Sequence, residues 1–397
     1  MDSPTKAGVL LGDHAYRLTP EPGRIITMRQ DSRHIALFMP SLGGGGAERV
    51  MLTLARAFAE GGDRVDVIVA DGRGAYCDKV PEHVSLIDLK AGRMLRAFVP
   101  LVRYLREERP DALLSTIAHA NIVAVLASAA ARVKTSVWVR EASTVSHSLG
   151  DNVKAEGLRA LMKLAYRRAD GVIAVSRGVG EALVEANIVG PEQISTIYSP
   201  MEIDAIEAAA EESVDHPWLA TARGTREMPL LLAVGRLTEA KDYPNLLHAL
   251  ALLQDQVPCR LLILGEGGKR AELEALVQQL GLSEQVQMPG FVDNPYAYMA
   301  RADVYVMSSR WEGLPTAPLQ AMAVGAKVVL TDCPSGPCEI LEDGQWGRLV
   351  PVNDSPALAE ALAETLQNDG LPDPRSRAQA FDHRVIAEHY RQRMVAS

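Results

Sequence analysis

Residues 308–325, SSRWEGLPTAPLQAMAVG, include the residue types needed to bind an anionic sugar ligand. Glu312 precedes a tight turn and can accept hydrogen bonds from sugar hydroxyls. Gln320 stands eight positions later, about one and a half turns into a small-residue helix that we predict over residues 317–324. We therefore expect a sugar nucleotide to lie across this stretch.

The turn between these two residues is suited to hold an anion. Gly313 and Leu314 offer backbone N–H groups, and the helix that follows begins with N–H groups that have no partner inside the helix. Pro315 suits the first turn of a helix, where its missing N–H is no loss. These backbone N–H groups therefore indicate an anion-binding site at this turn.

Two basic residues, Arg236 and Lys241, follow a predicted strand at residues 230–234 and are separated by four residues. They could converge on one diphosphate, with Arg236 as a bidentate fork and Lys241 as a point charge. The alternative is a pair of ordinary surface charges.

A glycine-rich loop, SLGGGGAER at residues 41–49, follows the first predicted strand. Glycines such as Gly44 and Gly45 let backbone N–H groups approach a phosphate closely. The dinucleotide fingerprint fails here, because its last glycine position falls on Glu48 or Arg49, which counts against a dehydrogenase. A tight turn without a ligand is the alternative.

His119 follows a predicted strand at residues 112–116, beside Asn121 at the start of a helix. A neutral imidazole there can bond sugar hydroxyls, although most lone histidines are structural. Arg140 and Glu141 end the next strand at the same edge, and their simplest interpretation is a local ion pair.

From residue 34 onward, short apolar runs alternate with helical patterns, and the candidate residues stand just after the apolar runs. This rhythm predicts parallel strands covered on both faces, in two doubly wound α/β domains. The predicted parts are a poorly ordered extension (1–33), a Rossmann-like acceptor domain (34–200), a linker (201–228), a Rossmann-like nucleotide-sugar domain (229–380) and a C-terminal helix that returns to the first domain (381–397). The predicted strands are 34–40, 65–70, 84–89, 112–116, 135–140, 171–176, 194–198, 230–234, 260–264, 286–288, 304–307, 327–331 and 347–351.

Composition narrows the classes further. The chain has 397 residues and a net charge of −9, which argues against a nucleic-acid partner. Its four cysteines form no disulfide framework or zinc set, and we expect reduced thiols in a cytoplasmic protein. No apolar run reaches the roughly 20 residues that a membrane-spanning helix requires, and no signal-peptide pattern opens the chain.

The motifs, taken together and in this order, resemble those of family 4 glycosyltransferases of the GT-B fold, over about residues 34–395. The family signature is a Glu, seven residues and a second Glu in the context EGLP…EAMA-G, and here Glu312 and Gln320 stand within WEGLPTAPLQAMAVG. The family's Arg-four-Lys element matches Arg236 and Lys241, and its glycine-rich first loop matches residues 43–46.

The resemblance implies two domains facing across a cleft and a retaining transfer, of hexosyltransferase type, without a metal or cofactor. The expected donor is a nucleotide sugar, most simply a UDP-sugar, and the expected acceptor is a glycan or polyprenyl-linked glycan, in polysaccharide or glycolipid biosynthesis. Arg236, Lys241 and the N–H groups from Leu314 to Thr316 would stabilise charge on the leaving phosphate. Glu312 and His119 would contact the donor sugar.

One position departs from the family pattern. The family's second Glu holds ribose hydroxyls, whereas an amide such as Gln320 offers one acceptor oxygen and one donor group. The ribose contact, and with it nucleotide affinity, is therefore in question at Gln320.

The acceptor is expected to enter from the first domain, where two basic segments near residues 93–109 and 158–168 carry leucines between arginines. They could rest on an anionic membrane that holds a lipid-linked acceptor, on its cytoplasmic face. Two ordinary surface helices are the alternative.

Two other function classes stay open. A sugar-nucleotide epimerase or a glycosyl phosphorylase could use the same fold, but epimerases lack the EGLP context and phosphorylases need a longer chain. A non-catalytic or weakly active nucleotide-sugar-binding protein is raised by Gln320.

Overall fold

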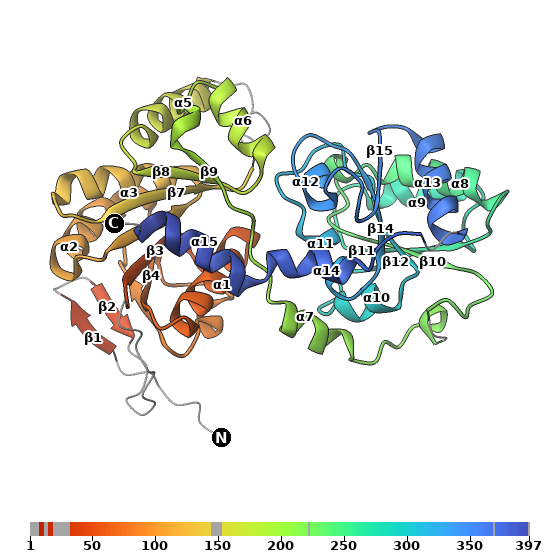
Figure 1. The fold of residues 1–397 in the computed structure, drawn as a ribbon, viewed down its shortest axis with the longest axis horizontal. Helices are drawn as coiled ribbons and strands as arrows, with labels where there is room; N and C mark the ends of the chain where they lie inside the picture. The colour runs from red at the N-terminus through yellow and green to blue at the C-terminus, as the bar shows by residue number, and fades with distance from the viewer. Residues whose placement is uncertain are drawn as a thin grey trace. The chain divides into compact units, whose positions relative to one another are not determined.

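The computed structural model describes residues 8–11, 15–18, 32–143, 153–220, 223–367 and 370–395. The chain forms two compact units: residues 1–201 with 383–397 (unit 1), and residues 202–382 (unit 2). Figure 1 shows that each unit is built around its own sheet.

Unit 1 contains a sheet with the order β1-β2-β5-β4-β3-β6-β7-β8-β9, in which β3 to β9 are parallel. Most of these strands form because they are short apolar runs that are buried on both faces, as parallel sheets require. Their bounds are β3 (His34–Ser41), β4 (Arg64–Asp71), β5 (Val84–Asp88), β6 (Ala112–Thr116), β7 (Ser136–Glu141), β8 (Gly171–Ala174) and β9 (Ile194–Thr196).

Helices cover both faces of this sheet and bury two apolar cores. One core is closed by α2 (Phe98–Glu108), α3 (Ala118–Ala131) and α5 (Val153–Tyr166). The other is closed by α1 (Gly46–Glu60) and α15 (His383–Val395). A further helix, α6 (Arg177–Glu185), follows β8.

The C-terminal helix α15 belongs to unit 1, although the chain passes through unit 2 before reaching it. Ile386, Tyr390 and Met394 of this helix are buried in the second core. The Tyr390 hydroxyl also accepts a hydrogen bond from Nε of the buried Arg140, at 3.2 Å. Apolar burial and this buried polar contact together attach the helix to unit 1.

Unit 2 contains a parallel sheet with the order β12-β11-β10-β13-β14-β15. Its strands are β10 (Leu230–Val234), β11 (Arg260–Leu264), β12 (Val286–Gly290), β13 (Val304–Met307), β14 (Lys327–Thr331) and β15 (Arg348–Val350). Its helices are α7 (Ile203–Ala210), α8 (Tyr243–Gln254), α9 (Arg270–Gln279), α10 (Tyr296–Arg301), α11 (Thr316–Ala323), α12 (Pro337–Leu341), α13 (Ser355–Gln367) and α14 (Pro374–Ala378).

The predicted α/β architecture of parallel sheets covered by helices is confirmed. All six of the unit 2 strands listed begin within one residue of the predicted positions, because apolar runs bounded by polar turns define them well. Within the described residues, no helix is both long and apolar enough to cross a membrane.

The predicted linker and the predicted N-terminal extension both contain regular secondary structure. Residues 201–228 include α7, whose Ile203, Ile206 and Ala210 are buried, and all of this segment after Met201 is part of unit 2. Within residues 1–33, the strands β1 (Gly8–Leu11) and β2 (Ala15–Leu18) form an antiparallel pair, and β2 pairs with β5. Most of the predicted extension lies outside the described residues.

Candidate donor-binding site

Glu312 lies in the loop between β13 and α11, at the carboxyl end of the unit 2 sheet. Its Oε1 atom accepts hydrogen bonds from the Lys241 Nζ group at 2.6 Å and from the Ser309 hydroxyl at 2.8 Å. The side chains of Lys241 and Glu312 are 22% and 17% exposed. Two candidate residues predicted from separate motifs are therefore in direct contact in a partly buried ion pair.

The backbone around Lys241 is fastened to the loop that carries Glu312. The Ser308 hydroxyl donates to the Lys241 carbonyl at 2.8 Å, and the Arg310 N–H donates to the Ala240 carbonyl at 2.8 Å. Asp242, next to Lys241, is buried and pairs with the Arg310 guanidinium at 3.0 Å. These contacts join the loops after the neighbouring strands β10 and β13 into one frame.

The negative charge of Glu312 helps to raise the pKa of two buried groups near the ion pair. Burial raises the pKa of Cys333 to about 12, and the Glu312 carboxylate adds to that effect. Burial first and the Glu312 charge second also raise the pKa of Tyr243. Both groups therefore stay protonated at neutral pH and act as fixed dipoles around the site.

Glycine is required where the loops approach one another. A Cβ atom on Gly235 would lie 2.9 Å from Cε of Lys241, and one on Gly265 would lie 2.0 Å from the Gly235 carbonyl oxygen. A side chain at Gly265 would displace the Gly235 backbone, and one at Gly235 would displace the end of the Lys241 side chain.

The start of α11 carries no side-chain cap. Pro315 is the residue just before the helix rather than its first residue, and it offers no side-chain acceptor for the first N–H groups. The preceding turn is braced from behind, because the Ser335 hydroxyl donates to the Gly313 carbonyl at 2.6 Å. Gly336 supports it too, with a φ of 101° that favours glycine.

Arg236 and Gln320 lie on the same two segments as Lys241 and Glu312, but neither contacts this ion pair through a hydrogen bond among the described residues. Arg236 is exposed in the loop after β10, and Gln320 is partly exposed within α11. Both side chains are free to meet a ligand at this edge of the sheet.

In unit 1, the predicted glycine loop connects β3 to α1. Residues 43–46 are all exposed, and Gly44 has a φ of 104°, which favours glycine. Gly45 precedes the first residue of α1, and no side chain caps the helix there. The loop therefore presents bare backbone at a helix start.

His119 lies at the start of α3, after β6, which is the neighbour of β3 in the sheet. Desolvation lowers the pKa of His119, so its ring is neutral at pH 7. The residue two positions earlier, Ile117, has a φ of 75°, which is strained for a β-branched side chain. His119 thus follows a distorted backbone turn and can act as a neutral hydrogen-bond partner.

Arg140 and Glu141 do not form a simple local ion pair. The buried Glu141 carboxylate accepts hydrogen bonds from the Tyr166 hydroxyl and from Nδ2 of Asn121 (3.0 Å for Asn121), and burial raises the pKa of Glu141. Arg140 points instead to Tyr390 and to the Ser199 hydroxyl, at 2.8 Å. Asn121 is therefore part of the core beneath His119 and not a free ligand group.

Both halves of the chain match glycosyltransferase family models. Residues 44–205 match "Glycosyltransferase Family 4" and residues 223–381 match "Glycosyl transferases group 1". The chain belongs to the family 4 glycosyltransferases of GT-B fold. The predicted family is thereby confirmed, with the Glu312 segment inside the second match.

Relatives of this glycosyltransferase act in glycan assembly. An N-acetylgalactosamine-N,N'-diacetylbacillosaminyl-diphospho-undecaprenol 4-alpha-N-acetylgalactosaminyltransferase of Campylobacter jejuni is 29% identical over 89% of this chain and 97% of its own length. The lipopolysaccharide core biosynthesis glycosyltransferase LpsE of Rhizobium meliloti is 26% identical over 87% of this chain and 92% of its own length. HepE of Anabaena, solved with UDP, shares the fold with a TM-score of 0.75 at 21% identity, over 92% of this chain and 100% of that one.

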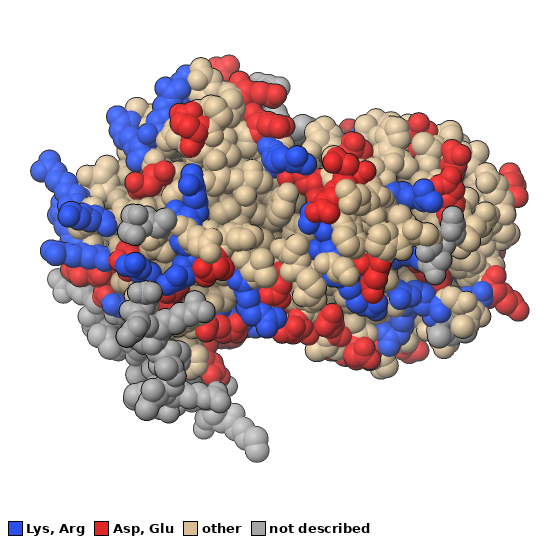
Figure 2. Space-filling model, in the orientation of Figure 1, with Lys and Arg blue, Asp and Glu red and all other residues tan. Residues whose placement is uncertain are grey.

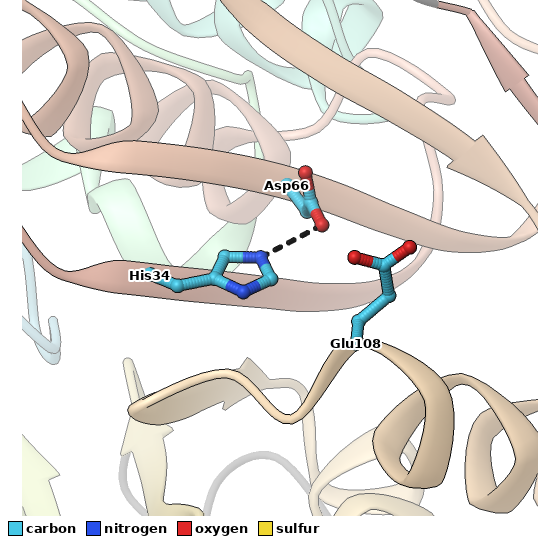
Figure 3. A group of neighbouring side chains, drawn as sticks. All are labelled: His34, Asp66 and Glu108. Carbon is cyan, nitrogen blue, oxygen red and sulfur yellow. Dashed lines mark hydrogen bonds and ion pairs between the residues drawn. The ribbon is translucent and has the colours of Figure 1, made fainter.

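One further cluster in this glycosyltransferase was not found from the sequence. His34, Asp66 and Glu108 converge at the opposite edge of the unit 1 sheet, as Figure 3 shows, with His34 Nε2 at 2.8 Å from Asp66 Oδ2. The Arg64 guanidinium pairs with Glu108 and lies 3.7 Å from Asp66. Because Arg64 already supplies the positive charge, we interpret this group as a structural polar cluster.

Proposed function

We propose that this glycosyltransferase transfers a hexose-type sugar from a UDP-sugar to a polyprenyl-linked glycan, with retention of the anomeric configuration. The observation that carries the proposal is the Lys241–Glu312 pair, held at 2.6 Å beside the open start of α11. The UDP bound to the structural neighbour HepE and the lipid-linked substrate in the name of the Campylobacter relative support the choice of donor and acceptor.

Each part of the site has a role in this reaction. As the anomeric bond breaks, negative charge builds on the β-phosphate of the leaving nucleotide. Lys241, Arg236 and the N–H groups from Leu314 to Thr316 stabilise that charge through fixed positive charges and dipoles. Glu312 accepts hydrogen bonds from the donor sugar and orients it.

Unit 1 supplies the second group of candidate residues. The backbone of Gly44 and Gly45 approaches a phosphate or sugar, and the neutral His119 ring bonds a hydroxyl of the donor sugar. The acceptor hydroxyl attacks on the face from which the nucleotide leaves, and its proton passes to the leaving phosphate. This route needs no side-chain base, which is consistent with the family resemblance.

We also propose that unit 1 rests on an anionic membrane where a lipid-linked acceptor is held. Leu95 and Val99 are 82% and 61% exposed near the start of α2, and Leu161 and Leu164 are 50% and 52% exposed on α5. Figure 2 shows Lys and Arg side chains gathered over this part of unit 1. Exposed leucines between cations are typical of helices that lie on a membrane surface.

Binding of nucleotides to the purified protein tests the donor assignment. A thermal-shift series with UDP, GDP and their sugars should show stabilisation by UDP and UDP-sugars above the other nucleotides. Lys241→Ala should weaken UDP binding about tenfold, because a charge-assisted contact to the diphosphate is lost. Lys269→Ala, which removes an exposed lysine paired with Glu272, is the matched control. Equal UDP affinity in all three proteins would contradict the assignment.

A further inference from the structure

Two groups that the proposed reaction uses for different purposes neutralise each other in the structure. The Lys241 ammonium group contacts Glu312 Oε1 at 2.6 Å. In the proposed function, Lys241 must contact the diphosphate and Glu312 must contact the sugar. A diphosphate that binds Lys241 therefore meets an ammonium group whose charge is already paired with the Glu312 carboxylate.

The geometry leaves Glu312 a second support when Lys241 changes partner. The Ser309 hydroxyl donates to the same Oε1 atom at 2.8 Å, and Ser309 is fully buried. The Ser309 carbonyl in turn accepts from the Thr331 hydroxyl at 2.6 Å. Glu312 thus stays anchored in the loop after β13, and through Thr331 on β14, when the lysine moves to another anion.

Lys241, by contrast, is held among the described residues by its backbone contacts and, at its side chain, by the ion pair with Glu312. Its carbonyl accepts from Ser308 and the next residue, Asp242, pairs with Arg310, while the side chain is 22% exposed. A lysine side chain on a fixed backbone can swing between two nearby anions with little other rearrangement.

We propose that Glu312 is an internal counter-anion that competes with the nucleoside diphosphate for Lys241. Diphosphate binding captures the ammonium group and leaves the carboxylate, held by Ser309, available to the sugar. When the sugar has been transferred, Glu312 pairs with Lys241 again and helps to displace the product nucleotide. This inference rests on the proposed function and concerns how its product is released.

Substitution of the carboxylate by an amide separates this role from catalysis. Glu312→Gln should bind UDP about fivefold more tightly than the wild type, because a partly exposed ion pair no longer competes for Lys241. Its affinity for uridine, which has no diphosphate, should be unchanged. Glu272→Gln, which removes the acidic partner of Lys269 on the same unit, should leave UDP affinity unchanged. Isothermal titration of the full-length proteins gives all of these values.

A double variant distinguishes competition from simple repulsion between Glu312 and the diphosphate. In the Lys241→Ala background, Glu312→Gln should give no gain in UDP affinity, because there is no lysine to release. A gain that persists in that background, or no gain in the single variant although UDP binds the wild type, would overturn the proposal. No binding of UDP by the wild type would overturn the proposed donor as well, so the two failures can be told apart.

Discussion

We propose that Gln320, at a partly exposed position of α11, takes the place of the second Glu in the family motif. An amide can bond one ribose hydroxyl as an acceptor, whereas a carboxylate can bond two with the added strength of its charge. We therefore predict that Gln320→Glu binds UDP about fivefold more tightly. Gln278→Glu, an exposed substitution of the same type on α9, is the control for the added charge.

Titration with UDP and with 2',3'-dideoxy-UDP tests the ribose contact directly. The gain in Gln320→Glu should disappear with the dideoxy nucleotide, because its ribose has no hydroxyls to bond. A gain of the same size for both nucleotides, or no gain for either, would show that residue 320 does not contact the ribose.

At the scale of single residues, the sequence alone predicted Lys241 and Glu312 as site residues, but it did not predict the ion pair between them. Their residue types and their places after strands were sufficient to assign them to one edge of a sheet. Ser309 was missed, because its contact with Glu312 depends on the conformation of the loop after β13 and not on spacing. The buried contacts of Glu141 with Asn121 and Tyr166 were missed for the same reason, since they join three separate elements.

At the scale of elements, the start of α11 depends on the loop that follows β14. Gly336 has a φ of 101°, and a Cβ atom there would lie 2.6 Å from Cδ of Pro315. We predict that Gly336→Ala displaces the turn before α11 and weakens UDP binding by about tenfold or more. Gly268→Ala, where a Cβ atom would meet nothing within 4 Å, is the matched control.

Circular dichroism and titration should be measured on the same samples of both glycine variants. Native secondary structure with weakened UDP binding in Gly336→Ala alone is the expected result. If both variants bind UDP as the wild type does, the turn before α11 does not hold the diphosphate.

The bounds of the strands were predicted more closely than the packing partners of the helices. A buried parallel strand is a continuous apolar run and can be found locally, as β10, β11, β13 and β14 were. The return of the C-terminal helix to the first domain was expected from the sequence, but its contact between Tyr390 and Arg140 was not. The place of α7 also depends on partners in other elements, since it packs against α10 and α11. Local patterns do not encode such contacts, so the addition of α7 to unit 2 became visible only in the structure.

At the scale of the whole molecule, a net charge of −9 makes the cationic surface of α2 and α5 a local exception. Not every arginine of this surface is available to a membrane. Arg106, for example, donates a hydrogen bond to the Ala130 carbonyl at the end of α3, at 3.0 Å. Arg96 and Arg103 are exposed and are the ones to change.

We predict that the double variant Arg96→Glu/Arg103→Glu loses most binding to vesicles of anionic phospholipid in a sedimentation assay, because each cation near such a surface contributes about 1 kcal/mol. Arg56→Glu/Arg384→Glu, on exposed positions of α1 and α15, should bind as the wild type does. Equal binding by both double variants would contradict the proposed membrane contact of α2 and α5, but it would not affect the proposed donor site.

The most direct test of the central claim is release of UDP from UDP-sugars in the presence and absence of a polyprenyl-diphosphate-linked glycan. The account predicts release that depends on the acceptor in the wild-type protein, and a loss of about a hundredfold or more in Glu312→Ala with UDP still bound. Binding of a UDP-sugar without release under any acceptor condition would contradict transfer. An unchanged rate in Glu312→Ala would contradict the site.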